Sequence, residues 1–143
     1  MKKKHRIVIC DDQDMFRITT RETLKHYAPD LEVAAEASGG EAGIAATLKL
    51  LPDLVLMDVL MPDLDGFEAT RQIVKASTVK VLAYSSLANW ETVDQMFEAG
   101  ARGYVLKQSD PRELVRGIRT VLEDGFFISP GLMSAPIPIE EEF

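Results

Sequence analysis

Four short, nearly continuous apolar runs recur along the chain, and segments of helix length separate them. They cover residues 6–10, 54–57, 79–84 and 103–106. Runs of this length that are apolar throughout are typical of parallel strands buried on both faces of a sheet. A fifth run, at residues 31–36, alternates between apolar and polar side chains, so we expect it to form a strand near an edge of the sheet.

The segments between the runs have the spacing and the boundary residues of amphipathic helices. We expect helices at residues 14–27, 39–51, 66–76, 90–99 and 111–124. The last helix has the clearest start, with Asp110 as its N-cap and Pro111 at its first position, and Gly125 should end it. Five alternating β-α units result, which predict a doubly wound, five-stranded parallel sheet with helices on both faces.

The composition changes near residue 125, where proline and glycine become frequent. We therefore expect one domain at residues 1–124 and a linker or C-terminal extension at residues 125–143, with no sixth β-α unit.

Polar side chains follow four of the apolar runs at the point where each run ends. Asp11 and Asp12 follow the first run, Asp58 the second, Ser85 the third and Lys107 the fourth. In an open parallel sheet, ligands bind outside the carboxyl ends of the strands, so we expect these groups to meet along one edge. Three carboxylates, a hydroxyl and an ammonium group suit a divalent cation and a phosphoryl group.

The metal interpretation depends on the three carboxylates together. An Asp-Asp pair after a strand is more often a turn or a helix N-cap, and a single lysine at a strand end is more often a surface residue. Three clustered carboxylates, however, repel one another unless a cation neutralises them. Mg²⁺ is the natural choice because it prefers oxygen ligands and bridges to phosphate. A calcium EF-hand loop starting at Asp58 fails, because Met61 and Gln72 stand where it needs oxygen ligands.

Composition narrows the class of protein further. The 143 residues, 46% hydrophobic and 27% charged, fit one globular domain, and a net charge of −7 argues against a nucleic-acid surface. The apolar runs are too short to cross a bilayer and no signal-peptide pattern opens the chain, so we expect no membrane contact. Cys10 is the only cysteine and lies inside an apolar run, which indicates a core residue in a reducing, cytoplasmic setting without disulfides or zinc.

Three longer motifs resemble those of the bacterial two-component response-regulator receiver domain, and within it the NarL/LuxR-type branch. They are the acidic opening at residues 11–17, the loop at residues 58–66, and the last strand and helix start at residues 99–114. The resemblance covers about residues 6–124. It implies a flavodoxin-like fold and a signalling switch that is phosphorylated on an aspartate, with self-phosphorylation and self-dephosphorylation as its only chemistry and no enzymatic turnover of a substrate.

The resemblance also implies a role for each acidic residue. Asp58 would be the phosphoacceptor, a nucleophile that forms an acyl phosphate. Asp12 and Asp58 would bind Mg²⁺ directly, Asp11 would bind it through a water molecule, and Leu60 would bind it through its backbone carbonyl.

Other positions would act on the phosphoryl group or respond to it. Ser85 would donate a hydrogen bond to one phosphoryl oxygen, and Lys107 would pair with another. Tyr104 matches the switch residue whose ring moves inward when Ser85 moves toward the phosphate. Gln108 stands where many receivers have proline, so we expect no cis peptide bond after Lys107.

Leucines occupy two positions that are often polar in receivers. They are Leu60, two places after Asp58, and Leu87, two places after Ser85. A leucine cannot hydrogen-bond the water molecule that would hydrolyse an acyl phosphate, so we expect slow self-dephosphorylation.

The resemblance implies partners as well. A sensor histidine kinase would supply the phosphoryl group, and the surface of the helix at 90–99, the strand at 103–106 and the following helix would report the state, with homodimers forming on activation. The branch normally continues into a helix-turn-helix module, so transcription control and DNA contact are expected only through a module absent from this chain. An excised receiver and a stand-alone regulator that acts through protein contacts stay open.

A rival interpretation is a haloacid-dehalogenase-like phosphatase, which also uses an aspartate nucleophile and Mg²⁺ on a parallel sheet. The segment Asp63-Leu64-Asp65-Gly66 superficially resembles its motif. That segment lies inside a loop and not directly after a strand, and no substrate cap is evident, so the switch is favoured.

Overall fold

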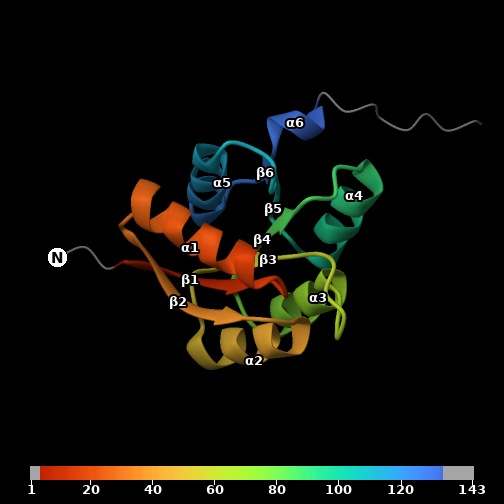
Figure 1. The fold of residues 1–143 in the computed structure, drawn as a ribbon. Coiled ribbons are helices and arrows are strands. Elements are labelled where there is room, and N and C mark those ends of the chain that lie inside the picture. Colours follow the sequence, from red (N-terminus) through yellow and green to blue (C-terminus); the bar gives the residue numbers. More distant parts are fainter. Residues whose placement is uncertain (1–3, 134–143) are drawn as a thin grey trace, which may run out of the picture.

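The computed structural model describes residues 4–133, and these residues follow the predicted alternation of strands and helices (Figure 1). The strands are β1 (His5–Cys10), β2 (Leu31–Ala37), β3 (Leu54–Met57), β4 (Lys80–Ser85), β5 (Gly103–Leu106) and β6 (Phe127–Ile128). The helices are α1 (Asp14–Tyr27), α2 (Gly40–Leu50), α3 (Gly66–Ala76), α4 (Trp90–Ala99), α5 (Pro111–Leu122) and the short α6 (Pro130–Met133).

The strands form one parallel sheet in the order β2-β1-β3-β4-β5-β6. Helices α1 and α5 cover one face of the sheet, and α2, α3 and α4 cover the other (Figure 1). Each face of the sheet packs against its helices in a separate hydrophobic core. Alternate side chains of β1 contribute to these two cores, with Ile7 and Ile9 on the α1 side and Val8 and Cys10 on the α2 side. The predicted doubly wound parallel sheet is therefore confirmed, and β2 lies at an edge as expected.

The prediction of five strands is one strand too few. β6 pairs with β5 in parallel, and the N–H of Ser129 donates to the carbonyl of Tyr104 at 2.9 Å. Leu132, a little further along, is fully buried in the core. A strand of two residues is too short to show a periodic pattern, so the sequence did not indicate it. Part of the expected extension thus packs on the sheet, while the domain boundary at residue 124 stays a prediction.

The start of α5 has the expected capping residue, and its end does not. The side chain of Asp110 accepts the N–H of Arg112 at 2.8 Å, which caps the start of α5 as predicted. The end of α5 differs from the prediction, because the helix stops at Leu122 and the left-handed residue is Asp124, with φ 68°, instead of Gly125. Within residues 4–133, no helix combines the length and the hydropathy that crossing a membrane requires.

Candidate functional site

The acidic residues meet because hydrogen bonding between strands continues one residue past the strand ends. The N–H of Asp58 donates to the carbonyl of Cys10 at 3.0 Å, and the N–H of Asp11 donates to that of Ala37 at 3.0 Å. Carboxylate oxygens of Asp11, Asp12 and Asp58 consequently lie within 4.8 Å of one another. The structure thus brings together the three acids that the sequence analysis grouped.

Lys107 joins this cluster from the far side of β4. Its backbone N–H donates to the carbonyl of Ser85 at 2.9 Å, which places the residue directly after β5. Its Nζ lies 2.6 Å from Oδ2 of Asp11 and 3.4 Å from Oδ2 of Asp58, and the side chain is only 5% exposed. The ammonium group therefore lies between two carboxylates and is almost shielded from water.

Burial sets the electrostatics of Asp58. It raises the pKa of the Asp58 carboxyl to about 6, and the negative charge of Asp11 adds to this effect. Lys107 and the N–H of Val59, which donates to Oδ1 of Asp58 at 2.8 Å, oppose the shift only in part. One ammonium group faces three carboxylates, so the negative charges of the cluster outnumber its positive charges.

These acids fit a divalent cation. Carboxylate oxygens are the ligands that Mg²⁺ prefers, and the clustering of three of them beside a single lysine leaves room for two further positive charges. Mg²⁺ is the ion that the sequence analysis expected here, and the acidic cluster that such binding needs is present.

A cavity of about 230 Å³ opens next to the cluster. It is lined by Asp12, Gln13, Asp58, Leu60, Ser85, Ser86 and Lys107. Residues from the ends of four different strands or their loops therefore face one hollow, as expected for the carboxyl edge of a parallel sheet. Leu60 is 61% exposed at this hollow, whereas Leu87 is not among the lining residues.

Ser85 and Tyr104 are connected through Leu87. The hydroxyl of Ser85 accepts the N–H of Leu87 at 3.1 Å, and the hydroxyl of Tyr104 donates to the carbonyl of Leu87 at 2.7 Å. Tyr104 is fully buried, and this burial raises its pKa to about 12. Leu87, in the loop after β4, is therefore hydrogen-bonded both to Ser85 at the site and to Tyr104 in the core.

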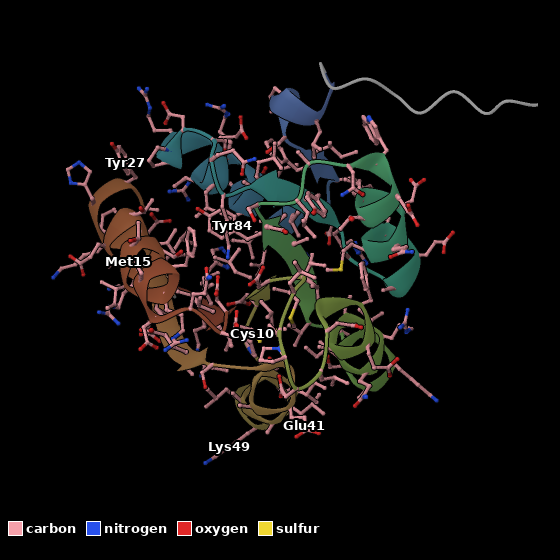
Figure 2. All side chains as sticks on the ribbon, turned by 45° about the vertical axis from the view of Figure 1, so that its right-hand side comes forward. Cys10, Met15, Tyr27, Glu41, Lys49 and Tyr84 are labelled. Carbon is pink, nitrogen blue, oxygen red and sulfur yellow. The ribbon has the colours of Figure 1, made fainter. Side chains whose placement is uncertain are left out.

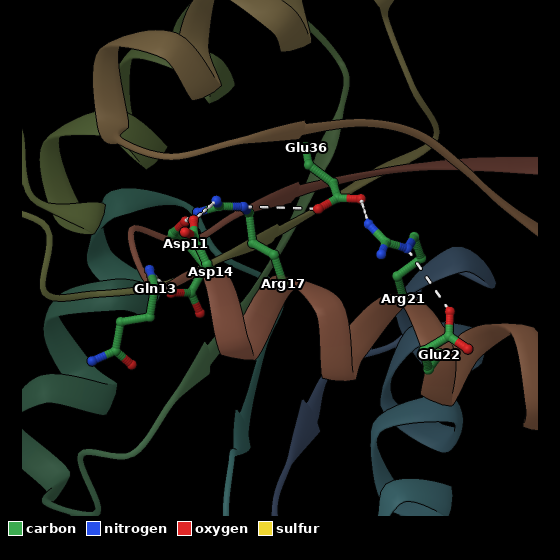
Figure 3. A network of polar contacts seen from close by, with 7 residues as sticks. All are labelled: Asp11, Gln13, Asp14, Arg17, Arg21, Glu22 and Glu36. Carbon is green, nitrogen blue, oxygen red and sulfur yellow. Dashed lines mark hydrogen bonds and ion pairs between the residues drawn. The ribbon is translucent and has the colours of Figure 1, made fainter.

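Arg17 supports the acidic cluster from α1, and the sequence analysis did not assign it this role. Figure 3 shows its guanidinium group between Asp11 and Glu36. One nitrogen donates to the backbone carbonyl of Asp11 at 2.5 Å, and the group also pairs with Asp14 and, at 3.7 Å, with Glu36. Arg21 pairs with Glu36 at 2.5 Å. Asp14 and Arg17 are three residues apart, which is a spacing typical of an ion pair on a helix, whereas Glu36 comes from β2 and no sequence pattern connects it to Arg17.

Asp63 and Asp65 have structural roles. The carboxylate of Asp63 accepts the N–H groups of Gly40 and Glu41 at 3.0 Å each, which caps α2 and lowers the pKa of Asp63. Asp65 accepts the N–H of Glu68 at 2.9 Å and caps α3. Both acids of the segment that resembles a phosphatase motif are therefore occupied as helix caps. The N-cap residue of α2 is a glycine, which has no side chain to accept the first N–H groups of the helix. In the sequence, this glycine was the only indication that a side chain from elsewhere, here Asp63, caps α2.

Cys10 lies in the interior below the site, as predicted (Figure 2). Its thiol donates to the carbonyl of Gly39 at 3.2 Å and lies 3.7 Å from the sulfur of Met61. Burial, together with the charges of Asp11 and Asp58, raises the pKa of this thiol to about 12. It is therefore a neutral core residue and neither a nucleophile nor a metal ligand.

Comparison with known proteins adds the family context. The family profile described as the response regulator receiver domain matches residues 7–119. The chain is 38% identical over 115 residues to the transcriptional regulatory protein LiaR of Bacillus subtilis (strain 168), covering 80% of this chain and 54% of that protein. It is 35% identical over 130 residues to the transcriptional regulatory protein DegU of Brevibacillus brevis, covering 90% of this chain and 55% of that protein.

A solved structure agrees with these relatives. The crystal structure of a LuxR-family two-component response regulator from Aurantimonas sp. SI85-9A1 has a TM-score of 0.86 and 34% identity, covering 91% of this chain and 93% of that chain. The chain spans about half the length of the curated relatives it matches.

Proposed function

This chain belongs to the family of response-regulator receiver domains, and we propose that it accepts a phosphoryl group on Asp58 from a sensor histidine kinase. One observation carries the proposal. The ammonium group of Lys107 lies 3.4 Å from Asp58 at a cavity that Ser85 also lines. A nucleophile, a cation and a hydroxyl donor around one hollow suit the transfer of a phosphoryl group, because such transfer depends mostly on positioning and charge.

In the transfer, a carboxylate oxygen of Asp58 attacks the phosphorus of a phosphohistidine. The new P–O bond forms as the P–N bond breaks, and the histidine nitrogen leaves with the electron pair. Lys107 is already close enough to follow the negative charge from the carboxylate to a phosphoryl oxygen. The hydroxyl of Ser85 accepts the N–H of Leu87 and lines the cavity, where it would donate its own proton to a phosphoryl oxygen.

Asp11, Asp12 and Asp58 would hold Mg²⁺, together with the backbone carbonyl of Leu60. When bound, the ion supplies positive charge that offsets the carboxylates and the phosphoryl oxygens. The clustering of three carboxylates beside a single ammonium group supports this assignment, because it leaves an excess of negative charge that a divalent cation would offset.

The signal would leave the site through β5, which contains Tyr104 and ends one residue before Lys107. Phosphorylation would bias a two-state equilibrium of the loop after β4, and the surface of α4, β5 and α5 would report the state to a partner or to a second copy of the chain. Two relatives are named as transcriptional regulatory proteins, so we propose that the output is transcription, through a module outside this chain. A receiver that acts by protein contacts alone is the second candidate, and the helix-capping roles of Asp63 and Asp65 disfavour a phosphatase.

Intact-mass analysis after incubation with acetyl phosphate and Mg²⁺ tests the phosphoacceptor. We expect one phosphoryl group on the natural chain, none on Asp58→Asn, and one on the control Asp94→Asn, which changes an exposed acid on α4. Undiminished labelling of Asp58→Asn would overturn the assignment. Multiple turnover of a phosphate ester by the natural chain would favour the phosphatase instead.

A further inference from the structure

Phe16 places an aromatic ring against the ammonium group of Lys107. The residue lies in the first turn of α1 and is half-buried. The Nζ of Lys107 is 4.0 Å from the centre of the Phe16 ring. The same nitrogen lies 2.6 Å from Asp11 and 3.4 Å from Asp58, so the ring completes the surroundings of a nearly buried cation.

An aromatic ring holds a cation without taking its hydrogen-bond donors. The face of the ring carries partial negative charge and attracts an ammonium group within about 6 Å, and the attraction grows when water is excluded. Lys107 is 5% exposed, so water is largely excluded from this contact. A third carboxylate in place of the ring would bind the ammonium group more tightly and compete with an incoming phosphoryl oxygen, whereas an aliphatic side chain would not attract it.

The backbone around Asp11 fixes where the ring lies. The N–H of Gln13 donates to the side chain of Asp11 at 2.9 Å, and Arg17 donates to its backbone carbonyl at 2.5 Å. These contacts hold the first turn of α1 against the residue that pairs with Lys107, and Figure 3 shows Gln13 and Arg17 beside Asp11. The ring and the carboxylate that hold the ammonium group are thus positioned by one local structure.

We propose that Phe16 is a positioning residue for phosphoryl transfer, which holds the ammonium group of Lys107 at the cavity through the face of its ring. The inference rests on the proposed function of Asp58 as phosphoacceptor. As the phosphoryl group arrives, Lys107 exchanges its contact with the Asp58 carboxylate for one with a phosphoryl oxygen, and it stays against the ring throughout.

A series of fluorinated phenylalanines at position 16 tests the proposal. Mono-, di- and trifluorophenylalanine keep the shape of the ring while withdrawing negative charge from its face. We expect the rate of Asp58 labelling by acetyl phosphate at saturating Mg²⁺ to fall stepwise with fluorination, by about three- to tenfold at the trifluoro ring. Phe16→Leu should lose at least as much, and Phe16→Tyr should restore most of the rate.

The control is Met15→Leu, because Met15 is the neighbouring residue on α1 and is 71% exposed (Figure 2). Its labelling rate should equal that of the natural chain. Labelling rates that are equal across the fluorinated series would overturn the proposal, as would Phe16→Leu being as fast as the natural chain.

A second measurement separates this proposal from the phosphoacceptor assignment. The NMR resonances of the Lys107 ammonium group and its neighbouring methylene protons, recorded without any phosphodonor, should shift stepwise along the same fluorinated series, because the ring face lies 4.0 Å from Nζ. If the natural chain is not labelled at Asp58 while these resonances still shift, the contact stands and the proposed function fails. If labelling occurs and the resonances do not change along the series, the positioning role of Phe16 is wrong.

Discussion

The hydroxyl of Ser129 donates a hydrogen bond to the buried carboxylate of Glu113 and accepts one from the N–H of Leu106. Ser129 follows β6, Glu113 belongs to the first turn of α5, and Leu106 is the last residue of β5. The side chains of Ser129 and Glu113 are both buried, and that of Ser129 is completely buried. One hydroxyl therefore joins three segments at a point one residue before Lys107.

Removal of this hydroxyl should destabilise the fold. Ser129→Ala leaves a buried carboxylate and a buried backbone N–H without their partner, so we expect the free energy of unfolding to fall by about 1–3 kcal/mol. Urea denaturation measures the change. The control is Thr120→Ala, which removes an exposed hydroxyl that donates to the carbonyl of Arg116. A loss in Ser129→Ala no larger than in this control would contradict the role of the contact.

The raised pKa of Asp58 makes a prediction about stability and pH. In metal-free buffer the folded protein holds this pKa at about 6, above its ordinary value of 3.8. Ionised Asp58 therefore destabilises the fold at neutral pH, and this cost disappears as the pH falls through 6 toward 4, where the folded protein takes up the proton first. Asp58→Asn should raise the free energy of unfolding by about 3 kcal/mol at pH 7 and by much less at pH 4.

The comparison with Asp94→Asn isolates this effect, because that variant removes an exposed carboxylate and should change stability little at either pH. Chemical denaturation of the three proteins with a chelator present gives the values. Mg²⁺ should shrink the advantage of Asp58→Asn at pH 7, since a bound cation stabilises the ionised natural chain. An advantage that is the same at pH 4 and pH 7 would count against a raised pKa.

Leu60 should lengthen the lifetime of the phosphorylated state. It is 61% exposed and lines the cavity, where it can cover the approach of water without orienting it. We expect Leu60→Asn combined with Leu87→Glu to lose the phosphoryl group about tenfold faster, a difference of about 1.4 kcal/mol in the barrier. Leu60 should account for most of this change, because Leu87 does not line the cavity.

The decay of label at equal Mg²⁺ concentration measures these lifetimes. Leu48→Asn, a change at an exposed leucine of α2, serves as the control and should leave the lifetime unchanged. A double variant that loses its label no faster than the natural chain would show that these leucines do not set the lifetime.

Trp90 should report the movement of the loop after β4. It is the only tryptophan and the first residue of α4, a few residues beyond Ser85. Among residues 4–133, its indole N–H is one of three buried side-chain groups without a hydrogen-bond partner, so small displacements should alter its surroundings. We expect its fluorescence emission to change when beryllofluoride and Mg²⁺ bind. An unchanged spectrum, in protein shown by mass or NMR to bind beryllofluoride, would argue against movement there.

The sequence predicts which residues gather at the carboxyl ends of the strands, because strand direction alone brings them together. Asp11, Asp58 and Lys107 each follow an apolar run, and parallel strands end on the same side. The positions of these three residues therefore needed no knowledge of packing, and the structure places their side chains within hydrogen-bonding or ion-pairing distance.

Contacts between elements that are distant in sequence were not predictable in the same way. Phe16 and Lys107 are separated by most of the chain, and nothing in the sequence near either one indicates the other. The bond between Ser129 and Glu113 depends on β6, a strand too short to have a pattern. Asp63 reads as a loop residue, and only the folded loop brings its carboxylate to α2.

The single cysteine, Cys10, can report local opening of the fold between β1 and α2. Cys10 packs against Gly43 of α2, where an added methyl group would lie 2.4 Å from the sulfur, so no alkylating reagent can reach the thiol in the closed fold. The thiol can be alkylated only when β1 and α2 separate. The alkylation rate therefore reports how often this local opening occurs. Because Cys10 directly precedes Asp11, any ligand that steadies the acidic edge should be visible as slower alkylation, in the natural chain and without an engineered label.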